Sequence, residues 1–339
     1  MTSIALDRLP RSLGLTARAF RDASDFEPMA ALQSLANAHD GIPWLPTEES
    51  FRTQVDGAEG LDPQADIVLV EDPHGLIAFA IVERIVRDGV PNYDLWGYVR
   101  PNHRRLGIGA ALFERNLGRI ASRVRWEDPD GAVVLRAHAN ELGVGHRALL
   151  EAHGFDLIRH FFLMRRTGLG EVPLEPLPAG LELRPVTVGQ HRRIWEAECE
   201  AFQDHWGAHT YTDHDFQVTF SQSALDTALW AVAWDGDEVA GVVQGWIWRE
   251  ENEATGIDRG WLEKISVRRP WRQRGLGRAL TAAGLARLRD AGMTEAMLGV
   301  DAQNPTRALG LYERLGFEVH QRSAVYGRSF DGPLPLMTP

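Results

Sequence analysis

Trp261-Leu-Glu-Lys-Ile-Ser-Val267 leads through Arg-Arg-Pro-Trp into Arg272-Gln-Arg-Gly-Leu-Gly277. The first of these runs is short and mostly apolar, which predicts a β-strand. Beyond Gly277 an apolar stripe with helical spacing continues to Leu288, and Gly292 follows where a helix C-cap is expected. Strand, glycine-rich turn and helix together place backbone N–H groups at a positive helix N-terminus, which favours binding of a phosphate group.

The same order of elements occurs earlier in the chain. Arg104-Arg-Leu-Gly107-Ile-Gly109 follows one predicted strand and precedes a predicted helix. Gly107 corresponds to Gly275, and the Gly-Phe pair at 154–155 corresponds to the pair at 316–317. Duplication of a whole domain explains both matches.

Length and composition agree with two domains. The 339 residues suit two domains of about 170 each. Residues 167–180 are rich in proline and glycine and predict a linker, so we expect domains at 1–166 and 181–330. The chain after Tyr326 carries further prolines and is expected to be poorly ordered.

Charge and residue usage exclude several classes of protein. A net charge of −11 argues against nucleic-acid binding, which needs a broad positive surface. No long apolar run predicts a membrane span, and no apolar signal core is present, so we expect a cytoplasmic protein. Cys199 is the only cysteine, which excludes an internal disulfide and a cysteine metal site. Lys264 is the only lysine, and a coding bias toward arginine is enough to explain that.

Two R-x-x-G-x-G segments in register, each followed by a Gly-Phe pair before a last strand, resemble the GCN5-related N-acetyltransferase (GNAT) family. The resemblance covers nearly the whole chain, twice, and the tandem arrangement resembles acetyltransferases built from two such domains. It implies an α+β fold with two tandem domains, each a mixed, mostly antiparallel sheet flanked by helices. It also implies acetyl-CoA as the acetyl donor. A Rossmann dinucleotide site is the competing phosphate site, but its motif belongs near the start of a βαβ domain.

The resemblance assigns cofactor-binding residues by position. In the second copy it places the pyrophosphate of acetyl-CoA on the glycine-rich loop and the thioester on backbone N–H groups of the preceding strand. The expected set is Ile265, Ser266, Val267, Arg272, Gln273, Arg274, Gly275, Leu276, Gly277, Arg278 and Asn304, with Arg104, Gly107 and Gly109 in the first copy.

Two residues of the second copy match the family's proton-transfer groups. Glu263 is the expected general base for the acceptor amine, and Tyr312 is the expected proton donor to the leaving thiolate. Strict strand alternation puts Trp261 and Glu263 on one face and Lys264 on the other. The alternatives are a solvent-facing strand carboxylate for Glu263 and an aromatic ring buried by a helix for Tyr312.

The first copy departs from this pattern. Leu95 stands where Glu263 does, and Leu150 stands where Tyr312 does. We therefore expect the N-terminal domain to be non-catalytic, although its loop is intact and could hold CoA.

The acceptor side is described only in outline by the sequence. Tryptophans and histidines, including His205, His209 and His214, cluster in the helical region of the second repeat, and we expect no metal there. An aromatic, partly polar pocket suits a small-molecule amine, so we expect an N-acetyltransferase that is a monomer or homodimer. The alternatives are an acyl-CoA-binding regulatory module without turnover and a peptide or protein N-acetyltransferase.

Overall fold

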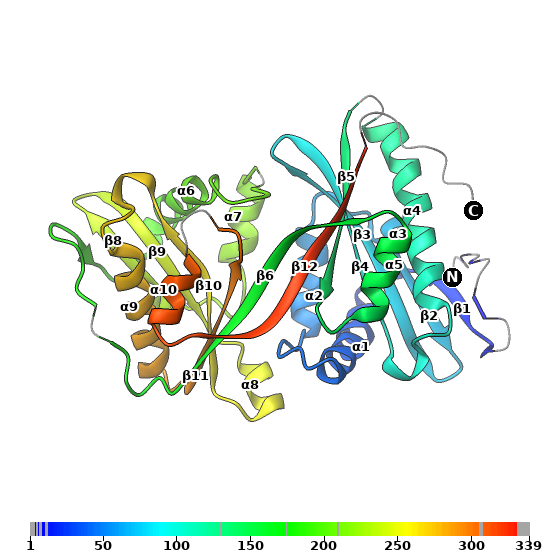
Figure 1. Ribbon diagram of the computed structural model, residues 1–339, viewed down its shortest axis with the longest axis horizontal. Helices are drawn as coiled ribbons and strands as arrows, with labels where there is room; N and C mark the ends of the chain where they lie inside the picture. Colours follow the sequence, from blue (N-terminus) through cyan, green and yellow to red (C-terminus); the bar gives the residue numbers. More distant parts are fainter. Residues whose placement is uncertain are drawn as a thin grey trace. The chain divides into compact units, whose positions relative to one another are not determined.

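The chain forms two compact units in the computed structural model (Figure 1). The structure describes residues 4, 6, 9, 10, 13–128, 131–173, 175–208, 210–304 and 308–330. Unit 1 comprises Met1–Ile158 and Ala324–Pro339, and unit 2 comprises Arg159–Ser323. In the described ranges no helix is long and apolar enough to cross a membrane.

Unit 1 is built on a sheet whose strands follow the order β1-β2-β3-β4-β5-β12. All described pairings among its first four strands are antiparallel, and β4 and β5 are parallel. The elements are β1 (Thr16–Ala19), α1 (Phe26–His39), α2 (Glu48–Gly57), α3 (Pro63–Asp66), β2 (Ile67–Asp72), β3 (Gly75–Arg87), β4 (Val90–Val99), α4 (Ile108–Glu127), β5 (Val133–Asn140), α5 (Val144–Ala152) and the C-terminal part of β12 (Glu318–Phe330).

The strands of unit 1 bury both faces, and alternate residues separate the two cores. Ile67 and Leu69 of β2 pack with α1 and α2, whereas Val68 and Val70 pack with α4. The helix after the glycine-rich loop therefore covers one face of the sheet, and the helices nearer the N-terminus cover the other.

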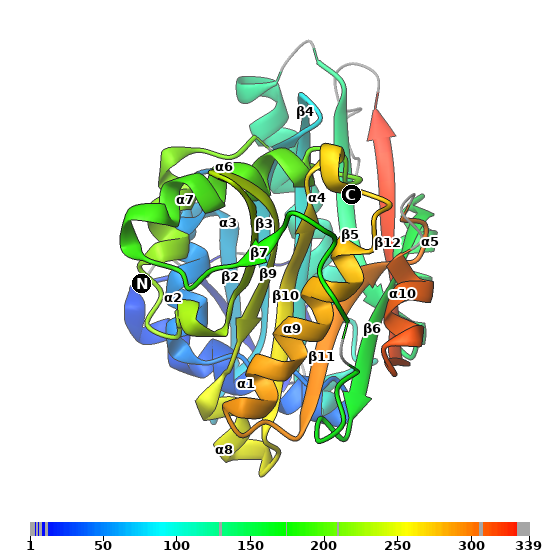
Figure 2. The same ribbon diagram turned by 90° about the vertical axis from the view of Figure 1, so that its left-hand side faces the viewer.

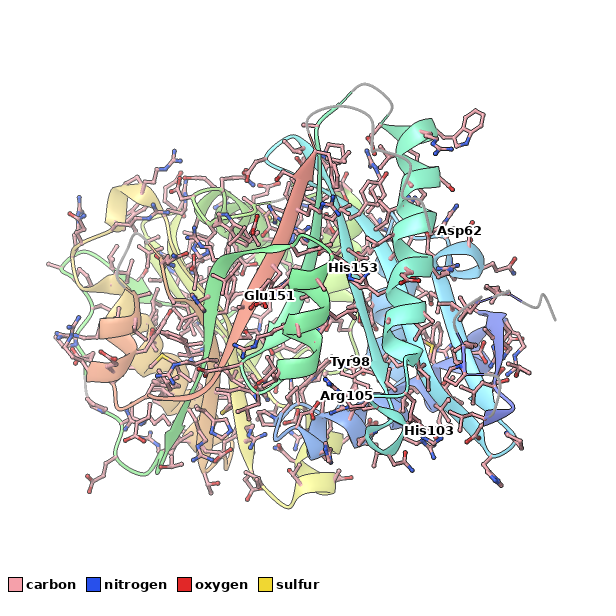
Figure 3. All side chains as sticks on the ribbon, turned by 45° about the vertical axis from the view of Figure 1, so that its right-hand side comes forward. Asp62, Tyr98, His103, Arg105, Glu151 and His153 are labelled. Atoms are coloured by element: carbon pink, nitrogen blue, oxygen red, sulfur yellow. The ribbon has the colours of Figure 1, made fainter. Side chains whose placement is uncertain are left out.

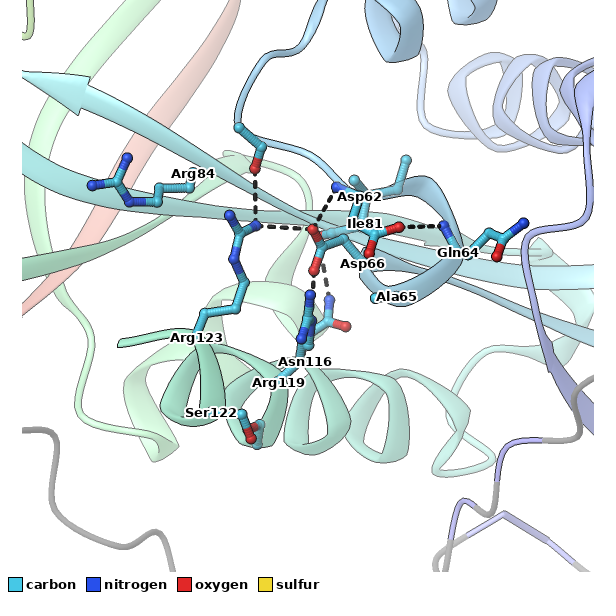
Figure 4. Close-up of polar contacts among 12 residues, drawn as sticks. Asp62, Gln64, Ala65, Asp66, Ile81, Arg84, Asn116, Arg119, Ser122 and Arg123 are labelled. Atoms are coloured by element: carbon cyan, nitrogen blue, oxygen red, sulfur yellow. Dashed lines mark hydrogen bonds and ion pairs between the residues drawn. The ribbon is translucent and has the colours of Figure 1, made fainter. Parts of the chain in front are cut away.

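A buried carboxylate fixes α4 to the sheet of unit 1 (Figure 4). Asp66 accepts from Arg119 at 2.7 Å and from Arg123 at 2.9 Å, and its side chain is fully buried. The Asp62 backbone N–H also donates to Asp66, at 2.8 Å. Arg123 donates in addition to the Gly60 carbonyl at 2.8 Å. Hydrogen bonds on all sides compensate the burial of this charge.

Unit 2 repeats the plan with the strand order β6-β11-β10-β9-β8-β7. Its α6 packs against β9 and β10, and its α9 packs against β8, β9 and β10 (Figure 2). The elements are β6 (Asp156–Thr167), β7 (Glu182–Leu183), α6 (His191–Phe202), α7 (Asp213–Phe220), β8 (Ala231–Asp235), β9 (Glu238–Trp246), α8 (Arg249–Thr255), β10 (Arg259–Val267), α9 (Leu276–Asp290), β11 (Glu295–Asp301) and α10 (Ala308–Arg314).

The repeated Gly-Phe pairs have a structural role that explains their position. Gly154 and Gly316 have φ of +73° and +82° and follow the ends of α5 and α10. The next residue closes the helix, since the N–H groups of Phe155 and Phe317 donate to the carbonyls of Leu150 and Tyr312 at 3.0 Å. Both phenylalanine rings are buried.

The compact units cut across the sequence repeats. The last strand of the first repeat, β6, pairs with β11 of unit 2 from Thr167 to Phe161. Conversely, β12 of the second repeat lies next to β5 in the strand order, and its Ala324 and Tyr326 belong to the core of unit 1. The boundaries at 1–166 and 181–330 remain a prediction about the sequence repeats, and each compact unit contains a strand segment from the other repeat.

Two local predictions change with the structure. The segment predicted as a linker packs on unit 2, because Leu169 is 1% exposed within its core and Glu175 contacts Arg278. The chain after Tyr326 was expected to be poorly ordered. That expectation is wrong for 327–330, which continue β12. Residues 331–339 lie outside the described part of the chain.

Candidate active site

A gap opens in the sheet of unit 2 where β10 leaves β11. Their parallel pairing covers Arg259–Trp261, although β10 continues to Val267 and β11 to Asp301. On the other side β10 stays paired with β9, but the register shifts between Leu262 and Lys264. Glu263 is therefore the extra residue of a β-bulge. Beyond Trp261, the β11-facing edge of β10 can pair with the amide groups of a ligand.

The bulge changes which side chains share a face of β10. Lys264 reaches Glu198 of α6, and Trp261 belongs to the apolar cluster that includes α6 residues. Leu262 belongs to the opposite cluster, which includes α9. The expectation that Lys264 points away from the face of Trp261 is therefore wrong. Strict alternation fails because the bulge inserts one residue between them.

Glu263 is accessible to solvent but is surrounded by protein on most sides. Burial raises the pKa of its carboxyl, and this effect outweighs the hydrogen bond from Trp248 and the charge of Lys264, which lower it. Trp248 stacks on Trp246 with the ring centroids 5.5 Å apart. A carboxylate with a raised pKa beside an open strand edge suits the role of a general base.

A buried polar network lies beside Glu263. Glu198 accepts from Lys264 Nζ at 2.7 Å and from Gln244 Nε2 at 2.6 Å. Trp246 Nε1 donates to Gln244 Oε1 at 3.3 Å and extends the network along β9. Burial raises the pKa of Glu198, and the Lys264 ammonium opposes that shift. The network thus fixes a carboxylate and an ammonium at the face of the sheet that α6 covers.

The glycine-rich loop of unit 2 has the backbone geometry of an anion site. Gln273 and Gly275 have φ of +60° and +88°, so two left-handed residues turn the chain into α9. The first bond of α9 runs from the Ala279 N–H to the Gly275 carbonyl at 3.1 Å. The N–H groups of Leu276, Gly277 and Arg278 precede that bond, and no side chain caps the helix.

The arginines of this loop differ in what they can do. Arg272 donates to the Val267 carbonyl at 2.8 Å and to Asp204 at 2.6 Å, which anchors the loop. Arg278 pairs with Glu175 at 2.8 Å, and Arg274 is exposed. The Leu276 side chain is buried in the core, so only its backbone can contact a ligand. Two of the three arginines are paired with carboxylates, so the groups that the loop offers to an anion are mainly its backbone N–H groups.

The two remaining predicted residues lie on the β11 side of the gap. Tyr312 of α10 is buried in the apolar cluster of unit 2, and burial raises the pKa of its hydroxyl. Its ring meets Phe317 edge-on with the centroids 6.1 Å apart. The Asn304 backbone N–H donates to the Asp301 carbonyl at 3.1 Å, and 305–307 lie outside the described residues. A neutral, buried tyrosine is suited to giving a proton rather than taking one.

Unit 1 has the same loop geometry, but its β3 and β4 pair without a bulge and leucines replace Glu263 and Tyr312. Arg105 and Gly107 have φ of +66° and +88°, nearly the values of Gln273 and Gly275. Figure 3 shows Arg105 and His103 where β4 leads into α4. However, β3 and β4 pair without a register shift from Ala78↔Val99 to Arg87↔Val90, so no bulge interrupts them.

The residues that replace Glu263 and Tyr312 in unit 1 are part of its core. Leu95 is 3% exposed and Leu150 is fully buried, and both belong to the cluster under α4. Arg104 repeats the anchoring of Arg272, donating to the Val99 carbonyl at 3.2 Å and to Asp40 at 2.6 Å. The loop geometry thus occurs with and without side chains equivalent to Glu263 and Tyr312.

Aromatic rings gather on α6 and α7 of unit 2, where the sequence predicts the acceptor pocket. Trp195 of α6 meets Phe216 of α7 with the centroids 5.5 Å apart, and the Arg192 guanidinium lies 3.8 Å from the Phe216 centroid. His205 packs on Phe202 at 4.4 Å, and burial lowers its pKa. His209 lies outside the described residues. Within the described residues no three His, Cys, Asp or Glu side chains are arranged to hold a metal ion.

Sequence pattern alone does not single out Glu198, Gln244 and Asp204, and strict strand alternation places Lys264 on the wrong face of β10. None of the three missed residues belongs to a recognisable motif, since their partners lie on other elements. One signal was available: a chain with 36 lysine and arginine residues contains a single lysine, and that lysine lies in the strand of the site.

Several known proteins similar to this chain belong to one family. The model of the GNAT acetyltransferase family matches residues 191–317. The mycothiol acetyltransferase of Kocuria rhizophila is 31% identical over 298 residues, covering 86% of this chain and 92% of that protein. The enzyme of the same name from Salinispora arenicola is 36% identical over 234 residues, covering 68% of this chain and 71% of that protein.

Solved structures show the same fold. A GCN5-related N-acetyltransferase from Sphaerobacter thermophilus superposes with a TM-score of 0.72 at 27% identity, covering 98% of this chain and all (100%) of that chain. A tandem GNAT protein from the clavulanic acid biosynthesis pathway superposes with a TM-score of 0.64 at 19% identity, covering 95% of this chain and 100% of that chain. The second match bears on the fold alone.

Proposed function

The chain belongs to the GNAT family of acetyltransferases, and we propose on that premise that it moves an acetyl group directly to a primary amine of a small molecule. The acetyl donor of this family is acetyl-CoA, and the protein is an acyltransferase. The proposed active site lies in unit 2. The mycothiol acetyltransferases, which are similar over most of this chain, support a small-molecule acceptor.

One observation carries the location of the site. In unit 2 a β-bulge presents Glu263 beside an unpaired strand edge, on the strand that leads to an uncapped helix N-terminus. In unit 1 the loop occurs without the bulge and with Leu95 in place of the glutamate. We therefore propose that unit 1 is non-catalytic.

The donor would bind along β10 and the loop. Its pyrophosphate carries negative charge, which suits the N–H groups of Gly275, Leu276, Gly277 and Arg278 at the positive end of α9. A Cβ at Gly277 would meet only ordinary contacts, the nearest at 3.5 Å, so packing alone does not demand glycine there. Close approach of a phosphate to the backbone would favour glycine at this position. The amide groups of the pantetheine arm would pair with the open edge of β10 near Ile265, Ser266 and Val267. Asn304 would contact the same arm.

The chemistry follows from the groups around the thioester. When bound, acetyl-CoA supplies a thioester carbon that an unprotonated amine attacks, so a C–N bond forms and a C–S bond breaks. Glu263 would take the proton from the amine, and its raised pKa suits that step. Backbone N–H groups of β10 would stabilise the negative charge that develops on the acetyl oxygen. Tyr312 would give its proton to the leaving sulfur.

Paired loop variants test this proposal. Gly275→Glu places a carboxylate in the loop at a left-handed position, so binding of acetyl-CoA and release of CoA thiol should both be lost. Gly107→Glu makes the same change in unit 1 and should leave turnover intact. Tyr312→Phe should lower kcat with little change in the KM for acetyl-CoA. If Gly107→Glu abolishes turnover while Gly275→Glu does not, the active site is not in unit 2.

A further inference from the structure

The only lysine of the chain lies next to the proposed general base. Lys264 follows Glu263 on β10, and consecutive Cα atoms are about 3.8 Å apart. Its ammonium donates to Glu198 at 2.7 Å, and the Lys264 side chain remains 31% exposed. An ammonium has three N–H donors, so one is committed to Glu198 while the group stays accessible from solvent.

The partner of Lys264 is fixed from several sides. The Glu198 side chain is 2% exposed, and Gln244 donates to its second oxygen at 2.6 Å. Gln244 is buried as well and is held in turn by Trp246. A buried carboxylate that accepts one hydrogen bond on each oxygen holds the ammonium in one place. A binding group needs this kind of preorganisation.

The choice of lysine is informative in this chain. Basic positions elsewhere are arginine, so Lys264 is a position where the compact ammonium occurs in place of the planar guanidinium. Glu198 is compact and buried, and a point charge can bond to it and still direct donors toward solvent. A guanidinium fork would engage the same carboxylate through two parallel bonds and direct fewer donors outward.

We propose that Lys264 binds a carboxylate of the acceptor, so that the acceptor is a small amino acid or an amino-acid derivative with a free carboxylate. This inference rests on the proposed function, because it requires the acceptor amine to lie at Glu263. The neighbouring positions of Glu263 and Lys264 match an amine and a carboxylate a few bonds apart in one molecule. Lys264 is then a specificity-determining residue, and Glu198 is the residue that positions it.

Matched carboxylates and carboxamides test the inference. The acceptor panel is alanine, β-alanine and phenylalanine with their amides, and the inhibitors are 3-phenylpropionate and 3-phenylpropanamide. The inhibitors lack an amine, so differences in amine pKa do not affect them. Wild type is expected to prefer the carboxylates by about 10- to 100-fold in kcat/KM or in inhibition constant, the range of a charge-assisted hydrogen bond.

Variants assign that preference to Lys264. Lys264→Met should remove it by raising the KM for carboxylates about 10- to 100-fold more than the KM for the amides. Lys264→Arg should keep part of it. Because Lys264→Met leaves Glu198 buried without its cation, the double variant Glu198→Gln/Lys264→Met serves as the folding control, checked by thermal melting. Arg289→Met, at an exposed ion pair on α9, controls for loss of a positive charge.

The outcomes separate this inference from the proposed function. Equal use of carboxylates and amides by wild type overturns the role of Lys264 and leaves the acetyltransferase proposal standing. If 3-phenylpropionate and 3-phenylpropanamide inhibit equally and no acceptor is turned over, both the role of Lys264 and the acetyltransferase proposal are contradicted. A carboxylate preference that survives in both Lys264→Met and the double variant also overturns it.

Discussion

Arg272 donates from Nη1 to Asp204 at 2.6 Å and from Nε to the Val267 carbonyl at 2.8 Å, and so joins the loop to the end of β10 and to the segment after α6. Hydrogen bonds from Arg269 and Arg272 hold the pKa of Asp204 well below its usual range, so this carboxylate stays charged throughout the physiological range. The first arginine of the loop therefore supports the backbone that would hold the phosphates.

Removing this anchor should weaken donor binding. Asp204→Ala is expected to raise the KM for acetyl-CoA about 5- to 10-fold with a smaller change in kcat, since its partly exposed ion pairs with Arg269 and Arg272 are both lost. Arg272→Ala should act in the same direction, and the double variant should add less than the sum. Initial-rate kinetics measure this. Unit 1 offers a matched control, because Arg104 and Asp40 form the same pair there. A similar rise in Asp40→Ala would contradict the assignment of the donor to unit 2.

The pH dependence of turnover should identify Glu263. Its pKa lies above the usual carboxyl value, so kcat/KM should fall as the pH is lowered through that raised pKa and protonates the base. Glu263→Gln should lower kcat about 10²- to 10³-fold and remove the acid limb of the profile. The exposed Glu250 on α8 supplies the control, and Glu250→Gln should keep both rate and limb. An unchanged profile in Glu263→Gln would show that another group takes the proton.

The buried Asp66 should dominate the stability of unit 1. Asp66→Ala removes the buried carboxylate that Arg119 and Arg123 share and leaves Arg123, whose side chain is 8% exposed, paired with Glu127 alone. It should lower the free energy of unfolding by about 3–5 kcal/mol. Urea denaturation measures the change. Glu48→Ala removes an exposed pair with Arg52 and should change the same quantity by less than about 1 kcal/mol. Equal effects of the two substitutions would refute the argument from burial.

A second carboxylate should make stability depend on pH. Glu83 lies opposite Asp94 across β3 and β4, and burial together with that neighbouring charge raises the pKa of Glu83 from 4.5 to about 7. The folded state then binds the proton more tightly than the unfolded state. The stabilising contribution of Glu83 is complete below about pH 4.5 and is lost as the pH rises through about 7.

Replacing the titrating group checks this sign. Glu83→Gln should remove the decline in unfolding free energy between pH 5 and pH 7.5 that wild type shows in urea titrations. Asp94→Asn should move the decline to lower pH, because the negative charge that helps to raise the pKa of Glu83 is gone. A wild-type stability that rises over this pH range would contradict the assignment.

The fold and the loop could be predicted because they depend on local pattern. Gly275, Gly292 and Gly316 all occupy left-handed positions at helix ends, and their spacing predicts where the helices begin and end. The assignment of Glu263 and Tyr312 to specific roles remains a prediction. Sequence could not give the bulge at Glu263, because a bulge depends on how β9 and β10 align, and nothing local to β10 records that register.

The contact between Lys264 and Glu198 could not be predicted for a related reason. Glu198 is one of several acidic residues on α6, and only the packing of α6 on β10 selects it as the partner of Lys264. The exchange of β6 and β12 between the repeats could not be predicted either, because the sequence of a strand does not specify which strand it pairs with.

That exchange has a consequence for biosynthesis. The ribosome completes residues 159–323, which form unit 2, before it adds the Ala324–Phe330 strand that borders β5 in unit 1. While unit 2 is being made, the nascent first repeat therefore carries an open edge at β5, a surface prone to wrong strand pairing. The sheet of unit 1 can therefore be completed only after the last strand of the second repeat has been synthesised.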